Sequence, residues 1–188
     1  MSTDFDPKAA RGRLLTLVRE RAYKSGVDIV LASGKRSDFY INGKFISLHP
    51  EGLYLMSMLM LEQLRELPGV TAVGGLTLGA DPIAAGICAL SHRTGQSIDA
   101  FLVRKEPKGH GTASQIEGTL EAGQKVVVIE DTITTGGSAR KAIDVVRAVG
   151  ADPVAVFALA DRMDPEGDAF RREFDVRPLF TIEEIRNG

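Results

Sequence analysis

Apolar residues follow two different spacings that alternate along most of the chain. Short stretches of mostly apolar residues predict strands at residues 70–73, 98–103, 125–129 and 154–159. Uninterrupted runs such as residues 126–129 are expected where helices cover both faces of a parallel sheet. Segments between these runs have helix-like patterns and predict helices at residues 50–67, 81–93 and 137–149. Alternation of this kind predicts an α/β fold in which helices flank a central, mostly parallel sheet.

The two ends of the chain are less regular than its middle. Asp6 followed by Pro7 predicts the start of a helix, because Asp caps a first turn well and Pro suits its first position. Residues 27–48 carry short apolar and aromatic stretches broken by glycine-containing turns, which predicts strands joined by turns. Residues 174–180 predict a further edge strand, and the length of 188 residues predicts one domain.

Composition narrows the classes of protein to consider. The formal net charge is −2, which argues against a dedicated nucleic-acid binder, because such proteins usually carry a basic surplus or stripe. The only cysteine, Cys88, excludes an internal disulfide and favours a reducing compartment. No apolar run is long enough to span a membrane, and the charged first residues do not resemble a signal peptide. We therefore expect a cytoplasmic protein that has neither nucleic acid nor a membrane as a partner.

The most informative segment begins where the strand predicted at residues 125–129 runs into two adjacent acids, Glu130 and Asp131. Glycines at positions 136 and 137 would let the backbone approach an anion, and the free N–H groups at the start of the next helix suit a phosphate. Hydroxyl groups that can add hydrogen bonds to phosphate oxygens belong to Thr132, Thr134, Thr135 and Ser138. Two acids beside an anion site need a partner of their own, such as vicinal ribose hydroxyls or a magnesium ion. An ordinary turn with two solvated acids is the alternative.

Residues 127–138, with the sequence VVIEDTITTGGS, resemble the phosphoribosyl-pyrophosphate motif of the type I phosphoribosyltransferases. The resemblance implies that Glu130 and Asp131 bind the ribose hydroxyls of phosphoribosyl pyrophosphate. It further implies that the loop binds the 5′-phosphate through Thr132, Ile133, Thr134, Thr135, Gly136, Gly137 and Ser138. The implied cofactor is Mg²⁺, held mainly by the substrate and near Asp131, so we assign no residue as a direct metal ligand. The motif identifies the superfamily but does not indicate which base the enzyme uses.

A second segment, RKEPKGHGT at residues 104–112, gathers four groups that can be cationic. Taken alone, it could be a solvated surface loop. It is similar to the flexible catalytic loop of the orotate phosphoribosyltransferases, which carries the pattern Arg-Lys-x-x-Lys-x-His-Gly. The resemblance implies pyrophosphate contacts, partly across a dimer interface, from Arg104, Lys105, Lys108 and His110. The implied catalytic residues are Lys108, His110 and Asp131, with His110 donating a hydrogen bond or a proton to the leaving group.

Two further features agree with an orotate-specific member of this family. Residues 33–41 resemble the segment whose backbone contacts orotate, with Tyr40 and Ile41 at the matching positions. Arg162 falls where the family has an orotate-binding arginine, and a guanidinium can bind the orotate carboxylate with two hydrogen bonds. Thr134 is assigned to the same subsite. A plain surface charge is the alternative for Arg162.

Residues 74–82, GGLTLGADP, resemble the pyrophosphate-side loop of the family. By this resemblance, the backbone amides around Leu78 and Gly79 face the ligand. The chain departs from some family members, which have lysine at the positions of Ala32 and Leu78. We therefore expect the positive charge of the site to come from the catalytic loop and from magnesium.

The resemblance covers roughly residues 8–182 and implies an enzyme. Its reaction would transfer the phosphoribosyl group of phosphoribosyl pyrophosphate to orotate, giving orotidine 5′-monophosphate and pyrophosphate in pyrimidine biosynthesis. It also implies a homodimer, and a core at about residues 50–165 under a hood formed by about residues 8–48 and 166–182. Two alternatives stay open: a sibling enzyme that acts on adenine, xanthine or another base, and a non-catalytic regulator that senses phosphoribosyl pyrophosphate.

Overall fold

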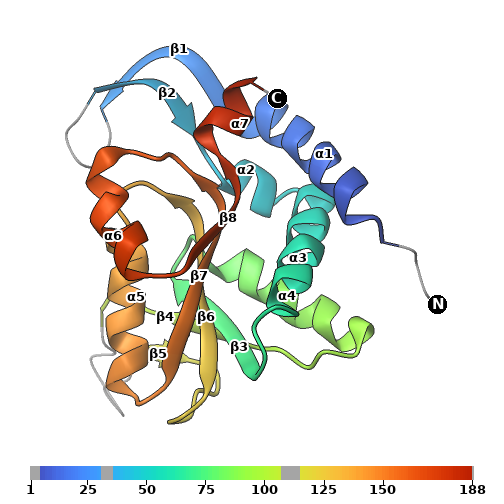
Figure 1. Ribbon diagram of the computed structural model, residues 1–188, viewed down its shortest axis with the longest axis vertical. Helices are drawn as coiled ribbons and strands as arrows, with labels where there is room; N and C mark the ends of the chain where they lie inside the picture. The colour runs from blue at the N-terminus through green and yellow to red at the C-terminus, as the bar shows by residue number, and fades with distance from the viewer. Residues whose placement is uncertain (1–4, 31–35, 107–114, 188) are drawn as a thin grey trace.

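The main sheet of the protein has six strands in the order β5-β4-β3-β6-β7-β8 (Figure 1). A computed structural model describes residues 5–30, 36–106 and 115–187 of the chain. The strands of the sheet are β3 (Val70–Leu76), β4 (Asp99–Val103), β5 (Ile116–Glu117), β6 (Lys125–Ile133), β7 (Asp152–Asp161) and β8 (Val176–Thr181). Neighbouring strands pair in parallel except for β4 and β5, which are antiparallel. The predicted mostly parallel sheet is confirmed, and β5 is an addition that the sequence pattern did not predict.

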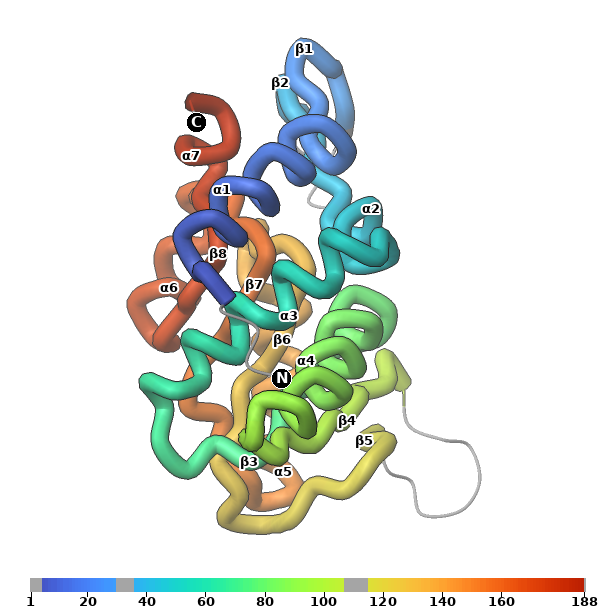
Figure 2. Tube along the Cα trace, turned by 90° about the vertical axis from the view of Figure 1, so that its right-hand side faces the viewer, coloured from blue at the N-terminus to red at the C-terminus, as the bar shows by residue number. Residues whose placement is uncertain are grey.

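Helices cover both faces of this sheet. Figure 1 shows α5 and α6 on one side and α1, α3 and α4 on the other, and Figure 2 looks onto the second layer with the sheet behind it. These helices are α1 (Pro7–Leu17), α3 (Pro50–Leu64), α4 (Asp81–Thr94), α5 (Gly137–Ala148) and α6 (Asp168–Glu173). The helix predicted at residues 50–67 is present but ends at Leu64. As predicted, Asp6 caps α1, because its carboxylate accepts hydrogen bonds from the N–H groups of Lys8 and Ala9.

The packing of β6 explains why residues 126–129 are all apolar. Val127 and Ile129 pack into the core shared with α1, α3 and α4, whereas Val126 and Val128 pack into the core shared with α5 and α6. All four side chains are buried. A strand in the middle of three layers needs apolar side chains on both of its faces. The core on both sides therefore fixes the position of β6, and with it the polar residues at its carboxyl end.

A smaller antiparallel sheet stands over the carboxyl ends of the main strands (Figure 1). It consists of β1 (Tyr23–Val30), which the π-helix η1 (Val18–Ala22) precedes, and β2 (Arg36–Ile41), which the short helix α2 (Lys44–Ser47) follows. The strands predicted within residues 27–48 are present, although β1 begins earlier and α2 takes the end of that range.

The carboxyl-terminal part of the chain contacts both sheets. The 3-10 helix η2 (Pro165–Gly167) leads into α6, and β8 then pairs with β7 in the main sheet. The last helix, α7 (Ile182–Asn187), reaches back to β2, where the Arg186 guanidinium lies over the Phe39 ring. The division into a core and a hood stays a prediction. Within the described part of the chain, none of the helices has the length and apolarity needed to cross a lipid bilayer.

Candidate active site

Glu130 and Asp131 lie near the carboxyl end of β6, and both are buried. The pyrophosphate-side loop packs directly against them. A Cβ built on Gly79 would lie 2.8 Å from Glu130 Oε1 and 3.4 Å from Asp131 Oδ1. Gly43, just before α2, is equally close, because its Cβ would lie 2.9 Å from Asp131 Cβ. The structure thus brings the two predicted acids and the predicted Gly79 together.

The two acids differ in their electrostatic surroundings. Burial, and after it the charge of Asp131, raise the pKa of Glu130 to about 8, so its carboxyl group is largely protonated at neutral pH. Asp131 instead has a cationic partner, since Lys44 Nζ lies 2.7 Å from Asp131 Oδ2. Burial lowers the pKa of Lys44, but the hydrogen bond and charge of Asp131 outweigh it and leave that pKa raised. The pair therefore presents one carboxylate with a counterion and one carboxyl group that can donate a hydrogen bond.

The residues after β6 form a tight turn into α5. Gly136 has a φ of 80°, and a Cβ there would lie 2.2 Å from the Phe170 ring, so this position requires glycine. The N–H group of Gly137 contacts Thr135 Oγ1 at 3.3 Å. Within the described chain, no side chain caps the start of α5. A helix start of this kind presents backbone N–H groups and positive charge to an anion.

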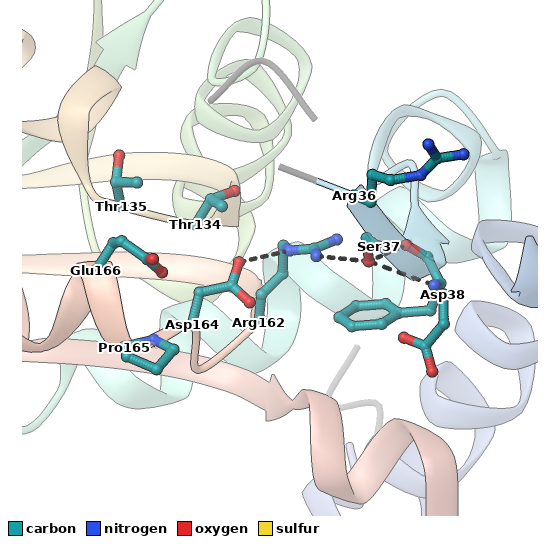
Figure 3. A pocket seen from close by; sticks show the side chains of 10 residues that line it. Arg36, Ser37, Asp38, Thr134, Thr135, Arg162, Asp164, Pro165 and Glu166 are labelled. Atoms are coloured by element: carbon teal, nitrogen blue, oxygen red, sulfur yellow. Dashed lines mark hydrogen bonds and ion pairs between the residues drawn. The ribbon is translucent and has the colours of Figure 1, made fainter. Parts of the chain in front are cut away.

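A cavity of about 460 Å³ opens beside this turn, between β2 and the residues that follow β7 (Figure 3). Its lining residues are Arg36, Ser37, Asp38, Phe39, Thr134, Thr135, Arg162, Asp164, Pro165 and Glu166. Arg162 is only 5% exposed, so it is not a plain surface charge. Its guanidinium donates hydrogen bonds to Asp164 Oδ2 at 2.9 Å and to Ser37 Oγ at 3.1 Å (Figure 3). The same group lies 4.1 Å from the centre of the Phe39 ring.

The turn that carries Arg162 is held by a buried ion pair. Asp161, at the end of β7, accepts a hydrogen bond from Arg171 Nη1 at 3.0 Å and another from the Met163 N–H group at 2.7 Å. The second contact stabilises a left-handed conformation at Met163, whose φ is 56°. The backbone N–H group of Arg162 also donates to the carbonyl oxygen of Ile133 at 3.0 Å. These contacts tie Arg162 to the ends of both β6 and β7.

Other predicted residues lie elsewhere. Neither Tyr40 nor Ile41 is among the described residues that line the cavity, and Ile41 is buried in the core. Their predicted contact with orotate is through the backbone and stays a prediction. The side chains that β2 contributes to the cavity include Ser37 and Phe39, which the sequence analysis did not select. Both fall inside the segment whose resemblance pointed to orotate, so that resemblance was the available signal.

Only some of the residues predicted to bind pyrophosphate lie in the part of the chain that the structure describes. Arg104 follows β4, and its Nε donates to Glu117 Oε1 at 2.6 Å, while Lys105 is exposed. Leu78 is also exposed, and its peptide bond with Thr77 is cis. Lys108, His110 and Ala32 lie outside the described residues, so the predictions made for them stay predictions.

Lys44 is a further residue at the acid pair that the sequence analysis did not select. Its contact with Asp131 joins positions 87 residues apart, and no local pattern around Lys44 indicates it. The described residues contain no cluster of three or more His, Cys, Asp or Glu side chains suited to a metal ion. Asp131 nevertheless offers carboxylate oxygens, the donor type that Mg²⁺ prefers, and would fit an ion held mainly by phosphate oxygens.

Comparisons with known proteins agree on one family. Residues 89–185 match the family model described as a phosphoribosyl transferase domain. The chain is 45% identical to the orotate phosphoribosyltransferase of Thermosynechococcus vestitus, over 93% of this chain and 92% of that protein. It is 44% identical to the protein of that name from Aquifex aeolicus, over 92% of this chain and 93% of the relative.

Solved structures give the same picture. The orotate phosphoribosyltransferase of Mycobacterium tuberculosis in complex with phosphoribosyl pyrophosphate is 35% identical, with a TM-score of 0.76, over 94% of this chain and 99% of the other. The same enzyme in complex with Fe(III) dicitrate is 37% identical, with a TM-score of 0.80, over 94% of this chain and 98% of the other. The adenine phosphoribosyltransferase of Leishmania donovani, at 17% identity and a TM-score of 0.63, shares the fold alone.

Proposed function

The chain belongs to the family of orotate phosphoribosyltransferases, and from this membership we propose how its residues perform the family's reaction. The enzyme transfers the phosphoribosyl group of phosphoribosyl pyrophosphate to orotate, which gives orotidine 5′-monophosphate and pyrophosphate. It is therefore a pentosyltransferase of pyrimidine biosynthesis. One observation supports the roles proposed for its residues: two buried acids, a helix start that no described side chain caps, and a buried arginine meet at the ends of β6 and β7.

We assign the ribose and its 5′-phosphate to the end of β6 and the start of α5. Asp131 would accept hydrogen bonds from the ribose hydroxyls, and Glu130, as a protonated carboxyl group, could donate one as well. The 5′-phosphate would bind to the first N–H groups of α5 and to the residues Thr132, Ile133, Thr134, Thr135, Gly136, Gly137 and Ser138. Thr132 Oγ1 supports this role, because it is buried and has no hydrogen-bond partner among the described residues.

We assign orotate to the cavity beside this turn. The contacts with Asp164 and Ser37 use two of the five N–H groups of the Arg162 guanidinium. The others would bind the orotate carboxylate, for which a planar guanidinium is well suited. Thr134 lines the same cavity, and we keep the backbone of Tyr40 and Ile41 as a further contact.

The proposed reaction breaks the bond between ribose C1 and a pyrophosphate oxygen and forms a bond between C1 and a ring nitrogen of orotate. That nitrogen loses its proton, which the departing pyrophosphate or solvent accepts. Positive charge develops on the ribosyl group and negative charge on the leaving pyrophosphate, so catalysis depends on positioning and electrostatic stabilisation. The backbone amides of Leu78 and Gly79 would face the pyrophosphate, together with Arg104, Lys105, Lys108 and His110. We propose Lys108, His110 and Asp131 as the catalytic residues. Mg²⁺ is the proposed cofactor and, when bound, would supply positive charge to the pyrophosphate oxygens.

We propose that the enzyme is a homodimer. Three apolar side chains in the segment that follows Lys44 are exposed: Phe45 (52%), Leu48 (73%) and Tyr54 (42%). They come from α2, the residue that follows it, and the beginning of α3. Large apolar side chains grouped in this way are typical of surfaces that pack against another protein. Leu48→Glu should therefore shift the molecular mass measured by light scattering from that of a dimer towards that of a monomer.

We propose that the enzyme works in the cytoplasm on small molecules. Its single cysteine, Cys88, fits a reducing compartment. The net charge of −2 provides no basic surplus for nucleic acid. Its partners would be orotate, phosphoribosyl pyrophosphate and a second copy of the chain.

The experiment that tests this proposal follows the absorbance of orotate after addition of phosphoribosyl pyrophosphate, with and without magnesium. Adenine, uracil and hypoxanthine are assayed in parallel. We expect magnesium-dependent loss of orotate, release of pyrophosphate and no reaction of the other bases. Turnover of another base instead of orotate would overturn the assignment of the Arg162 cavity. Binding of phosphoribosyl pyrophosphate without turnover of any base would point to a regulator.

A further inference from the structure

Lys44 places an ammonium group at the acid pair from an element that the resemblance left out of the site. Lys44 Nζ lies 2.7 Å from Asp131 Oδ2. The Asp131 side chain is buried and that of Lys44 is half-exposed, so this contact is screened less than an ion pair on the open surface. The backbone reinforces the contact, because Gly43 packs against the Asp131 side chain so closely that a Cβ would not fit.

The two oxygens of Asp131 face different neighbours. Oδ2 accepts the hydrogen bond from Lys44, whereas Oδ1 lies on the side of Gly79 in the pyrophosphate-side loop. A carboxylate has about four acceptor positions, so the contact with Lys44 leaves Oδ1 able to accept from ribose hydroxyls. Lys44 therefore fixes the rotation of the carboxylate without occupying the oxygen that faces the loop.

The positive charge of Lys44 has a second effect, which concerns the repulsion between Asp131 and the substrate. The chain has Ala32 and Leu78 where some family members have lysine, so these two positions supply no cation. Phosphoribosyl pyrophosphate is a polyanion, and an unpaired Asp131 carboxylate would repel it. An ammonium group in contact with Asp131 offsets that repulsion. The expectation that positive charge comes from the catalytic loop and magnesium alone is therefore incomplete.

We propose that Lys44 is a positioning residue for phosphoribosyl pyrophosphate: it holds Asp131 in the orientation that binds ribose and offsets its negative charge. This inference rests on the proposed function, because it takes the ribose-binding role of Asp131 as its starting point. It adds a residue from α2 to a phosphoribosyl-pyrophosphate site that we assign to the end of β6, the start of α5, the loop after β3 and the residues after β4.

The test compares Lys44→Met, which keeps most of the apolar stem, with Lys44→Arg, which keeps the charge. Lys125→Met is the matched control, because Lys125 is an exposed lysine at the opposite end of β6. Calorimetry measures binding of phosphoribosyl pyrophosphate without a base, and steady-state assays give the KM of each substrate. Loss of one charge-assisted contact predicts binding weaker by about tenfold in Lys44→Met, with the KM of orotate within about twofold of the wild type. Lys44→Arg should recover most of the loss, and Lys125→Met should match the wild type.

Asp131→Asn, measured in the same way, separates this inference from the proposed function. If Asp131→Asn weakens binding and Lys44→Met does not, the role of Lys44 is wrong while that of Asp131 stands. If neither variant changes binding, the ribose-binding role of Asp131 is wrong and the inference fails with it. Tighter binding in Lys44→Met, or an equal rise in both KM values with a lowered melting temperature, would also overturn the proposal. The second result would mean that Lys44 only stabilises the fold.

Discussion

The ribose-phosphate region and the base cavity lie side by side but are built differently. The ribose-phosphate region is the run of residues 127–138, in which a strand buried on both faces leads through a tight turn into α5. The base cavity takes its lining from β2, from the turn after β6 and from the residues after β7. One region is therefore contiguous and set mainly by its backbone. The other is assembled from distant segments and depends on contacts between side chains.

This difference predicts two kinds of response to substitution. In the ribose-phosphate region, a change that disturbs the backbone should reduce the stability of the whole protein, because β6 is the centre of the sheet. In the base cavity, a change to one side chain should mainly affect recognition of orotate. Substitutions that separate stability from the KM of each substrate can test this contrast.

The largest effect is expected for Gly136→Ala. Its positive φ and the overlap of the new Cβ with Phe170 should together lower the free energy of unfolding by roughly 3 kcal/mol or more. Gly137→Ala is the matched control, because its Cβ would meet only Thr135 Oγ1, at 3.4 Å. That variant should stay within about 1 kcal/mol of the wild type. Urea unfolding measures both, and equal losses would mean that the backbone at Gly136 has no special role.

The next effect concerns the cavity. Arg162→Gln should raise the KM of orotate roughly a hundredfold, because a pair of hydrogen bonds to a charged group contributes about 3 kcal/mol. The KM of phosphoribosyl pyrophosphate should change by less than about threefold, since none of its proposed contacts involves Arg162. Arg177→Gln, which removes an arginine of β8 that is paired with Asp175 and Glu66, is the control. An equal rise in both KM values would show that the two regions do not act separately.

The same contrast explains what the sequence could predict. The main strands, the helices and the ribose-phosphate motif were predicted because each depends on residues that are neighbours in the chain. Arg162 was selected only by resemblance, and its contacts with Ser37 and Phe39 became visible when the fold brought β2 to the end of β7. Lys44 was missed for the same reason, because its partner Asp131 is 87 residues away. The burial that raises the pKa of Glu130 likewise arises from packing and not from the local sequence.

A smaller effect should appear as pH dependence of stability in the ribose-phosphate region. The pKa of Glu130 is raised from 4.5 to about 8, first by burial and then by the charge of Asp131. Between these values the folded protein keeps a proton that the unfolded chain has released, so stability should fall as the pH rises. The contribution is at most about 1.4 kcal/mol for each pH unit. Urea unfolding at pH 6 and pH 7 should therefore show a smaller loss in Glu130→Gln than in the wild type. Equal losses would mean that Glu130 does not titrate in this range.

The smallest effect tests how far the side-chain network of the cavity extends. Phe39 contacts two guanidinium groups, that of Arg162 at 4.1 Å and that of Arg186, on α7, at 4.5 Å from the ring centre. Arg186 also donates a hydrogen bond to Asp38 Oδ1 at 3.1 Å, so α7 holds the strand that carries Phe39.

Arg186→Met should therefore make the Phe39 ring, which packs against the Arg162 guanidinium, less firmly held. Loss of an exposed cation–π contact predicts a rise of about two- to fivefold in the KM of orotate, with kcat and the KM of phosphoribosyl pyrophosphate almost unchanged. Arg13→Met, which breaks the exposed ion pair between Arg13 on α1 and Glu51 on α3, is the control for a general loss of surface charge. If Arg186→Met changed neither KM, the contacts that matter for orotate binding would extend to Phe39 but not to Arg186. If it changed both equally, α7 would stabilise the whole fold, and the base cavity would be less independent than its contacts indicate.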